Sequence, residues 1–152
     1  MTHEKNLYLD DLPVGTTLRS AARTISGDDI DAYCELSGDH NPLHKDDAWV
    51  RANTPFTQRI AHGLLVLGAS SGTPCPEMDA LLIVAYLSES RSFKAPTYPG
   101  DSIVTEWKVI ENRESKSKPE QGLVRFAVTC TKQDGTVVQD GDDLLLVAKR
   151  PA

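Results

Sequence analysis

The sequence predicts an α+β fold in which one antiparallel sheet wraps around a buried central helix. The first half of the chain has the apolar spacing of helices, and the second half has the two-residue alternation of strands. Between them, residues 60–72 are apolar on nearly all sides and rich in small residues, which is typical of a helix at the centre of a fold. At 152 residues the chain has the size of one ordinary domain, so we expect residues 1–152 to form a single domain.

The first half begins with a predicted strand over residues 16–25, which follows the turn signal at residues 13–15. Ser26 and Asp29 have the spacing of a capping box, so a short helix is expected to begin after Ser26. Gly38 is placed to end that helix, because glycine adopts the left-handed conformation found just after many helices.

A polar loop at residues 39–44 comes next, and Asp46 is placed to cap a second short helix over residues 47–52. The central helix is expected within residues 60–72, and Pro74 helps to stop it because proline cannot continue a helix. These boundaries place the polar loop close to the start of the central helix.

The second half alternates apolar and polar residues in four segments. The dipeptide Asp134-Gly135 is a strong hairpin signal, and residues 99–101 form another turn signal. We therefore predict four strands, over residues 81–93, 102–110, 123–132 and 137–149.

Composition and charge exclude several classes of protein. The net charge is −6, and no basic face of the kind that nucleic-acid binding needs is visible. No apolar run approaches the roughly 20 residues of a membrane helix, and the N-terminus lacks the pattern of a secretory signal. We expect a cytoplasmic protein without a membrane or nucleic-acid partner.

Three widely separated cysteines argue against a disulfide framework, and no pair has metal-ligand spacing. Cys34 and Cys130 lie in apolar periodic segments and are expected to be buried small hydrophobic residues, whereas Cys75 is expected in a loop. No metal site is predicted from them.

The polar loop brings together a carboxylate, Asp39, an amide, Asn41, and an imidazole, His44. A carboxylate and an imidazole that contact the same water molecule can share the roles of base and acid, as the addition of water to an activated double bond requires. Partial burial would be needed to move their pKa values toward neutrality.

The addition of water to an activated double bond also builds negative charge on a substrate oxygen, and hydrogen-bond donors are needed to stabilise that charge. Backbone N–H groups at the start of a helix stabilise such charge with the help of the helix dipole. Gly63 lies where the central helix begins, and glycine there allows a ligand to approach the backbone closely.

Each of these residues also has an ordinary structural interpretation. Asp39 and Asn41 are common turn residues, and His44 can be a histidine with structural hydrogen bonds only. For His62 we favour a hydrogen bond that fixes the loop to the helix over a catalytic role. Ser70 and Ser71 can simply be small residues where the sheet approaches the helix.

Three basic residues have two interpretations each. Arg91 and Lys94 are expected to face solvent from a strand rather than to bind a ligand. Arg59 can pair with a carboxylate on a substrate, but a surface position is favoured. Composition and spacing alone lead no further than a polar loop beside a buried helix.

Three motifs resemble one known family. The string YCELSGDHNPLH at residues 33–44 resembles the hydratase motif of the MaoC-like (R)-specific enoyl-CoA hydratases, and IAHGL at residues 60–64 resembles the start of their central helix. The string SFKAPTYPGD at residues 92–101 resembles their strand and turn of the form Phe-x-x-Pro-x-x-x-Gly-Asp. The last forty residues match only in strand pattern.

The resemblance implies a hot-dog fold, a homodimer with the two sheets joined edge to edge, and the reversible hydration of trans-2-enoyl-CoA to (R)-3-hydroxyacyl-CoA. Asp39 and His44 fall on the catalytic dyad of the family, Asn41 on its loop-organising asparagine, and Gly63 on the glycine whose N–H contributes to the oxyanion hole. The acyl group is carried by coenzyme A or sometimes by an acyl carrier protein. No metal or redox cofactor is implied.

Two positions match the family less directly. Ser71 lines up with a serine that supports the hydrogen bonds of the active site, although Ser70 is an equally good choice. Leu64 stands where many relatives have methionine, and this near-isosteric exchange can reshape the acyl tunnel without touching the chemistry.

Two other functions stay open. A hot-dog thioesterase would hydrolyse the thioester, and a non-catalytic subunit would bind acyl thioesters without changing them. Acyl length, the carrier, the direction in the cell and the dyad member that moves the proton are not readable from the sequence.

Overall fold

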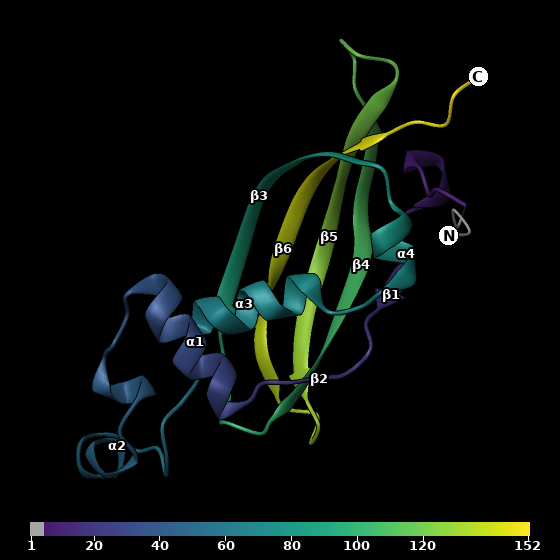
Figure 1. Cartoon of the computed structure of the whole chain (residues 1–152). Helices are drawn as coiled ribbons and strands as arrows, with labels where there is room; N and C mark the ends of the chain where they lie inside the picture. Colours follow the sequence, from purple (N-terminus) through teal and green to yellow (C-terminus); the bar gives the residue numbers. More distant parts are fainter. Residues whose placement is uncertain (1–4) are drawn as a thin grey trace.

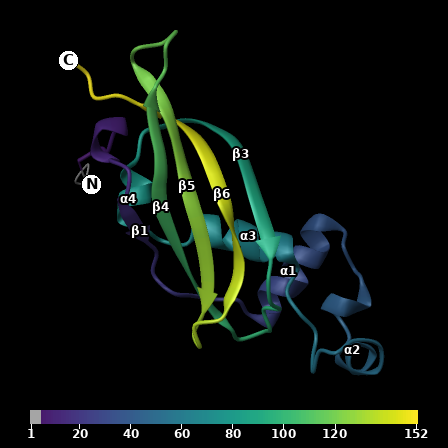
Figure 2. The same cartoon turned by 180° about the vertical axis from the view of Figure 1, so that it is seen from behind.

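A curved antiparallel sheet lies against helix α3, which crosses one of its faces (Figure 1). The computed structural model describes residues 5–152. Residues 1–4 belong to the N-terminal stretch that is expected not to be a secretory signal, and they lie outside the described residues. The strand order is β1-β4-β5-β6-β3, and β2 pairs with β4. Seen from behind, the sheet lies in front of α3, and α1 and α2 lie to one side, beyond the edge strand β3 (Figure 2). This is the predicted α+β, hot-dog arrangement.

The predicted elements are found with small changes in their ends. The strand expected over residues 16–25 is divided in two, because the N–H of Ala21 leaves the sheet to donate to the carbonyl of Pro74. The short helix α4 was not predicted. The elements are η1 (Leu9–Asp11), β1 (Thr17–Arg19), β2 (Arg23–Thr24), α1 (Gly27–Ser37), η2 (Pro42–His44), α2 (Asp47–Asn53), α3 (Gly63–Gly72), α4 (Pro76–Ala80), β3 (Ile83–Phe93), β4 (Ser102–Glu114), β5 (Gln121–Lys132) and β6 (Val137–Ala148).

Helix α1 is closed at both ends as its sequence predicts. The Ser26 hydroxyl accepts the N–H of Asp29 at 3.0 Å, and the Asp29 carboxylate accepts the N–H of Ser26 at 2.9 Å. Gly38 adopts the left-handed conformation, with φ of 78°, and ends the helix. These caps set the direction in which the chain enters the polar loop.

Helix α3 is buried on one side only. Val66, Ala69 and Ser70 are buried on the side that packs toward the sheet, whereas Leu64 is 61% exposed on another side. The expectation of a helix buried all round is therefore confirmed only for the face that packs on the sheet. One curved sheet covers only one face of a helix, so the other face stays exposed.

Arg91 does not face solvent, and that expectation was wrong. Its guanidinium lies 2.7 Å from the Asp143 carboxylate, and the two side chains are only 3% and 4% exposed. Arg91 pairs across the strands with Gly141, where an added Cβ would lie 1.9 Å from the carbonyl oxygen of Ser90. Strands β3 and β6 thus approach closely and enclose the ion pair. Lys94, in contrast, is half exposed.

All three cysteines are free and buried, which confirms the expectation for Cys34 and Cys130. Burial raises the pKa of Cys130 to about 11, so its thiol stays protonated near neutral pH. Cys75 lies in the short connection between α3 and α4, as expected, where it is the N-cap residue of α4.

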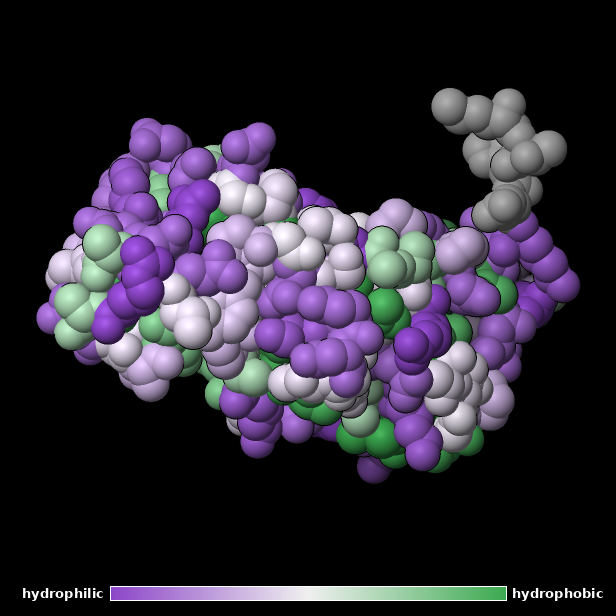
Figure 3. Space-filling model, turned by 90° about the horizontal axis from the view of Figure 1, so that it is seen from below, coloured by the Kyte–Doolittle hydropathy of each residue, from purple (hydrophilic) through white to green (hydrophobic). Residues whose placement is uncertain are grey.

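Polar residues cover most of the end of the molecule that carries α2, at the left of Figure 3, and apolar residues form smaller patches elsewhere on this face. Across residues 5–152, no helix is both long enough and apolar enough to span a bilayer.

Candidate active site

The loop after α1 is shaped by hydrogen bonds from its own polar side chains. Asp39 donates its N–H to the Ser37 hydroxyl at 3.1 Å, and its Oδ1 accepts the N–H of Asn41, also at 3.1 Å. Asn41 caps η2 by accepting the N–H of Leu43 at 2.9 Å. Because Asp39 uses Oδ1 in this way, its other oxygen is left to face His44.

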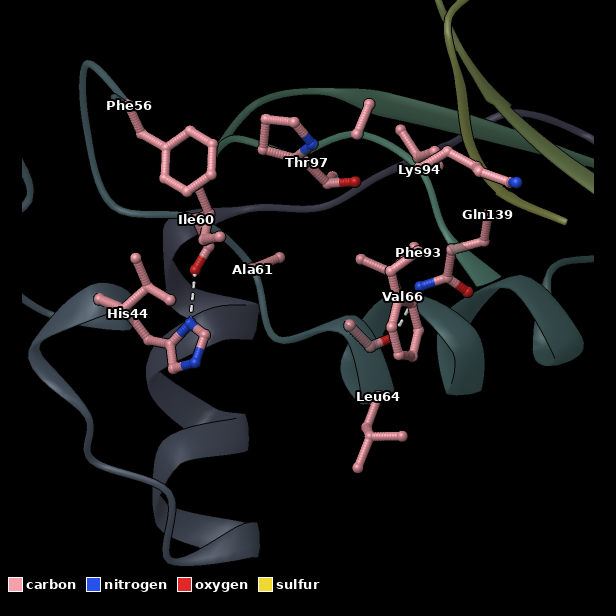
Figure 4. Close-up of a pocket in the computed structure, with 15 residues that line it drawn as sticks. His44, Phe56, Ile60, Ala61, Leu64, Val66, Phe93, Lys94, Thr97 and Gln139 are labelled. Carbon is pink, nitrogen blue, oxygen red and sulfur yellow. Dashed lines mark hydrogen bonds between the residues drawn. The ribbon is translucent and has the colours of Figure 1, made fainter. Parts of the chain in front are cut away.

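His44 is oriented by a backbone carbonyl. Its Nδ1 donates to the carbonyl of Ile60 at 2.8 Å, as the dashed line in Figure 4 shows. A neutral imidazole with the proton on Nδ1 presents an unprotonated Nε2. The ring is therefore held with its basic nitrogen directed at Asp39.

Asp39 and His44 form the pair that the sequence predicts. His44 Nε2 lies 3.7 Å from Asp39 Oδ2, and the side chains are 10% and 51% exposed, respectively. This distance is too long for a direct hydrogen bond, but a water molecule can contact both atoms. The structure thus brings a carboxylate and an imidazole close together, with the carboxylate half exposed to solvent.

His62 joins this pair to the central helix. Its Nε2 donates to the carbonyl oxygen of Asp39 at 3.1 Å, as expected for a residue that fixes the loop to the helix. The His62 ring stacks on His44, with centroids 3.7 Å apart, and meets the edge of Tyr33. Burial lowers the pKa of His62 below its ordinary 6.5, and the neighbouring His44 lowers it further.

This lowered pKa predicts a pH-dependent stability. Below about pH 6.5 the unfolded chain protonates His62 while the folded chain resists it, so the free energy of unfolding is expected to fall as the pH falls from 7 to 5. Denaturant unfolding at several pH values should show a shallower fall for His62→Gln. His40→Gln, an exposed histidine of the same loop, is the control for losing one imidazole. An equal slope in wild type and His62→Gln would contradict the prediction.

Asp39, His44 and His62 each offer a ligand atom, and these atoms lie within 4.8 Å of one another. The lone pairs of imidazole nitrogens lie in the ring planes, and the two rings are stacked only 23° from parallel. Their lone pairs therefore run side by side instead of converging on a tetrahedral metal. This geometry favours proton transfer over metal binding.

Gly63 is the first residue of α3, so its N–H belongs to the group of amides that have no partner inside the helix. A cavity of about 450 Å³ lies beside it, and both Gly63 and His44 line its wall. Figure 4 shows His44 and the start of α3 on either side of this space. A ligand in the cavity can therefore meet both the first amides of α3 and the His44 ring.

The remaining wall of the cavity is mostly apolar. Its other lining residues are Leu43, Phe56, Ile60, Ala61, Leu64, Val66, Phe93, Lys94, Ala95, Pro96, Thr97, Val138 and Gln139. The sequence indicates Phe93 only as part of the motif at residues 92–101, and it gives no distinct indication of Gln139. Its signal was weak because the last strand matched the family in pattern alone.

The two serines of α3 lie away from this wall. Ser71 is exposed, and its hydroxyl donates to the carbonyl of Leu67 within the helix. Ser70 is buried, and its carbonyl accepts the hydroxyl of Thr105 at 3.0 Å. Neither serine touches the dyad in the single chain, so a role for Ser71 in the site stays a prediction.

Arg59 connects the segments around the dyad. Its guanidinium lies 2.6 Å from the Asp31 carboxylate and donates to the carbonyl of His44 at 3.2 Å. Its side chain is only 19% exposed. Arg59 is therefore partly buried and not freely exposed at the surface, and it ties α1 to the loop that carries His44.

The arrangement matches known proteins in sequence and structure. The model of the MaoC like domain matches residues 11–130. The chain is 37% identical over 147 residues to the 3-hydroxybutyryl-CoA dehydratase of Methylorubrum extorquens, across 95% of this chain and 86% of that protein. It is 36% identical over 146 residues to the (R)-specific enoyl-CoA hydratase of Rhodospirillum rubrum, across 94% of this chain and 93% of that protein.

The solved structures agree. The crystal structure of the MaoC-like dehydratase from Rhodospirillum rubrum has a TM-score of 0.81 and 26% identity, and the match covers 97% of this chain and all of that one. The family model spans most of the chain, and both sequence relatives exceed 30% identity over nearly all of it. The chain belongs to the MaoC-like domain family.

Proposed function

We propose that this protein is a hydro-lyase that adds water to trans-2-enoyl-CoA, giving (R)-3-hydroxyacyl-CoA, and that it also catalyses the reverse dehydration. The observation that carries the proposal is that His44, whose Nε2 lies 3.7 Å from Asp39 Oδ2, lines a cavity that the start of α3 also lines. The names of the two sequence relatives describe the two directions of this chemistry, a dehydratase and an (R)-specific hydratase.

The dyad activates water in the proposed mechanism. A water molecule between Asp39 Oδ2 and His44 Nε2 gives up a proton to the pair as its oxygen attacks C3 of the enoyl thioester. C2 then takes a proton from the pair on the same face, and the 3-hydroxyacyl product leaves with the dyad restored. The two groups act together in both proton transfers.

The amide of Gly63 stabilises the enolate. Attack at C3 moves negative charge to the thioester oxygen, and the N–H of Gly63 with the positive end of the α3 dipole lies beside the cavity where that oxygen would bind. These groups supply all the acid–base and electrostatic chemistry that the reaction needs, so we propose no metal or redox cofactor. The apolar wall of the cavity suits a hydrocarbon acyl chain.

The test uses purified protein and crotonyl-CoA, with two signals followed together. Hydration is expected to remove the enone absorbance without release of free thiol, and chiral analysis is expected to show the (R)-product. Release of thiol would instead identify a thioesterase. Binding of crotonyl-CoA with neither signal would identify a non-catalytic subunit. The same assay with an acyl carrier protein thioester distinguishes the two carriers.

We further propose that the protein is a homodimer joined through strand β3. Within residues 5–152, β3 pairs only with β6, so its other edge is free. Natural proteins rarely leave a long apolar edge open to solvent, since it invites pairing with another chain. The large apolar residues exposed on or beside this strand are Leu82, Ile83, Val84, Tyr86, Leu87 and Phe93. A second copy can continue the sheet by pairing the same edge about a two-fold axis.

Charges on this edge are expected to separate the dimer. We expect the double variant Val84→Asp/Leu87→Asp to be a monomer, because pairing of the two edges would remove water from each new carboxylate. Light scattering after size exclusion should give the mass of one chain for this variant and of two chains for the wild type. Val14→Asp, at an exposed valine outside β3, should stay dimeric. A dimeric double variant would show that β3 is not the interface.

A further inference from the structure

The first turn of α3 rests on a pair of residues from neighbouring strands. Phe93 on β3 and Gln139 on β6 are direct cross-strand partners. The Gln139 side chain donates its Nε2–H to the carbonyl of Gly63 at 2.7 Å. The ring of Phe93 occupies the place of a side chain at Gly63, where an added Cβ would lie 3.0 Å from the ring. Figure 4 shows Phe93 and Gln139 close together beside the start of the helix.

A β-bulge aims Gln139 at the helix. On β5, Cys130 pairs with Gln139 and Thr131 pairs with Val137, so Val138 is an extra residue in β6. Val138 and Gln139 are consequently both buried and both line the cavity, whereas regular alternation would turn one of them outward. Bulges of this kind often redirect a side chain next to an active site.

Packing alone does not account for a glutamine here. Gln139 is 3% exposed, and its Oε1 is buried without a hydrogen-bond partner among the described residues. An unsatisfied buried acceptor destabilises a fold, so an apolar side chain of similar length would pack at lower cost. What the glutamine adds is its hydrogen bond to the carbonyl of Gly63. A carbonyl oxygen has two lone pairs, so that of Gly63 can accept this bond in addition to a hydrogen bond within the helix.

We propose that Gln139 is a positioning residue that acts through Gly63. This inference rests on the proposed hydratase function. By holding the Gly63 carbonyl, Gln139 keeps the first turn of α3 from shifting, so the Gly63 N–H stays aimed at the thioester oxygen. Donors that stabilise a developing charge work best when they are fixed before the reaction. Gln139 itself takes no part in proton transfer.

The test compares Gln139→Met with the wild type on crotonyl-CoA. Methionine keeps the unbranched length but cannot donate, so kcat is expected to fall about tenfold while KM changes little, because the lost alignment matters most in the transition state. Gln139→Asn keeps the amide but falls one methylene short of the Gly63 carbonyl, and the same loss is expected.

A spectroscopic signal separates positioning from general destabilisation. Butyryl-CoA labelled with ¹³C at the thioester carbon cannot be hydrated, and its carbonyl stretch should shift to lower frequency when it binds the wild type. The shift should shrink in Gln139→Met. Val147→Ala, a buried change farther along β6 in a different part of the core, should lower the melting temperature yet keep both kcat and the carbonyl shift.

Two outcomes overturn the inference, and they can be told apart. A wild type that does not hydrate crotonyl-CoA would overturn the proposed function and the role of Gln139 with it. An active wild type whose Gln139→Met and Gln139→Asn variants keep full kcat and the full carbonyl shift would overturn the role of Gln139 alone.

Discussion

Asp39→Asn and His44→Gln are each expected to lower kcat for crotonyl-CoA hydration about a thousandfold, within the range known for loss of a general acid or base. Neither change should disturb the fold. Asparagine keeps the oxygen that accepts the N–H of Asn41, and glutamine keeps an N–H that can donate to the carbonyl of Ile60. The loss should therefore appear in kcat, with the circular dichroism spectrum and melting temperature close to those of the wild type.

The same segment of the chain supplies matched controls. Glu35→Gln removes a nearby exposed carboxylate, and His40→Gln removes an exposed imidazole from the same loop. Both should keep wild-type kcat, since neither side chain lines the cavity or is paired with His44, whereas Asp39 lies 3.7 Å from the His44 ring nitrogen. If Asp39→Asn and His44→Gln kept most of their activity, or if the controls lost as much, the assignment of the dyad would be wrong.

Arg91→Met is expected to lower the free energy of unfolding by about 3–5 kcal/mol, the usual cost of breaking a buried ion pair on one side. The change leaves the Asp143 carboxylate enclosed between β3 and β6 without its partner. Unfolding in urea at one fixed protein concentration measures the loss, because dissociation of a dimer would add a concentration-dependent contribution.

Removal of both charges should restore most of this stability. In Arg91→Met/Asp143→Leu no charge is left to desolvate, and apolar side chains can fill the same space. Arg19→Met breaks an ion pair with Glu106 whose side chains are 62% and 44% exposed, so it should change stability little. A small loss in Arg91→Met, similar to that in Arg19→Met, would show that the Arg91–Asp143 pair is open to water.

Local signals explain how much of the fold the sequence predicts. The capping box at Ser26 and Asp29, the left-handed Gly38, and the hairpin at Asp134-Gly135 all involve residues within a few positions of one another. Such contacts depend on the local chain alone, so their residue types reveal them. The order of the motifs along the chain likewise predicts that the polar loop at residues 39–44 meets the start of the central helix.

Contacts between distant segments could not be predicted in the same way. Alternation along β3 does not reveal that Arg91 turns toward Asp143, because that depends on its register against β6 and on the close approach that Gly141 allows. The contact of Arg59 with Asp31 depends in the same way on how α1 packs against the segment before α3.

By itself, the sequence determined the α+β hot-dog arrangement, the family, and the choice of Asp39, His44 and Gly63 as candidate site residues. Only the tertiary structure decided that His62 stacks on His44, that Arg59 braces the loop, and that a bulge in β6 brings Gln139 to Gly63. Residue type and spacing encode interactions within a segment, but packing and strand register arise from the whole chain at once. The geometry of the site therefore becomes visible only after the sheet has closed around the helix.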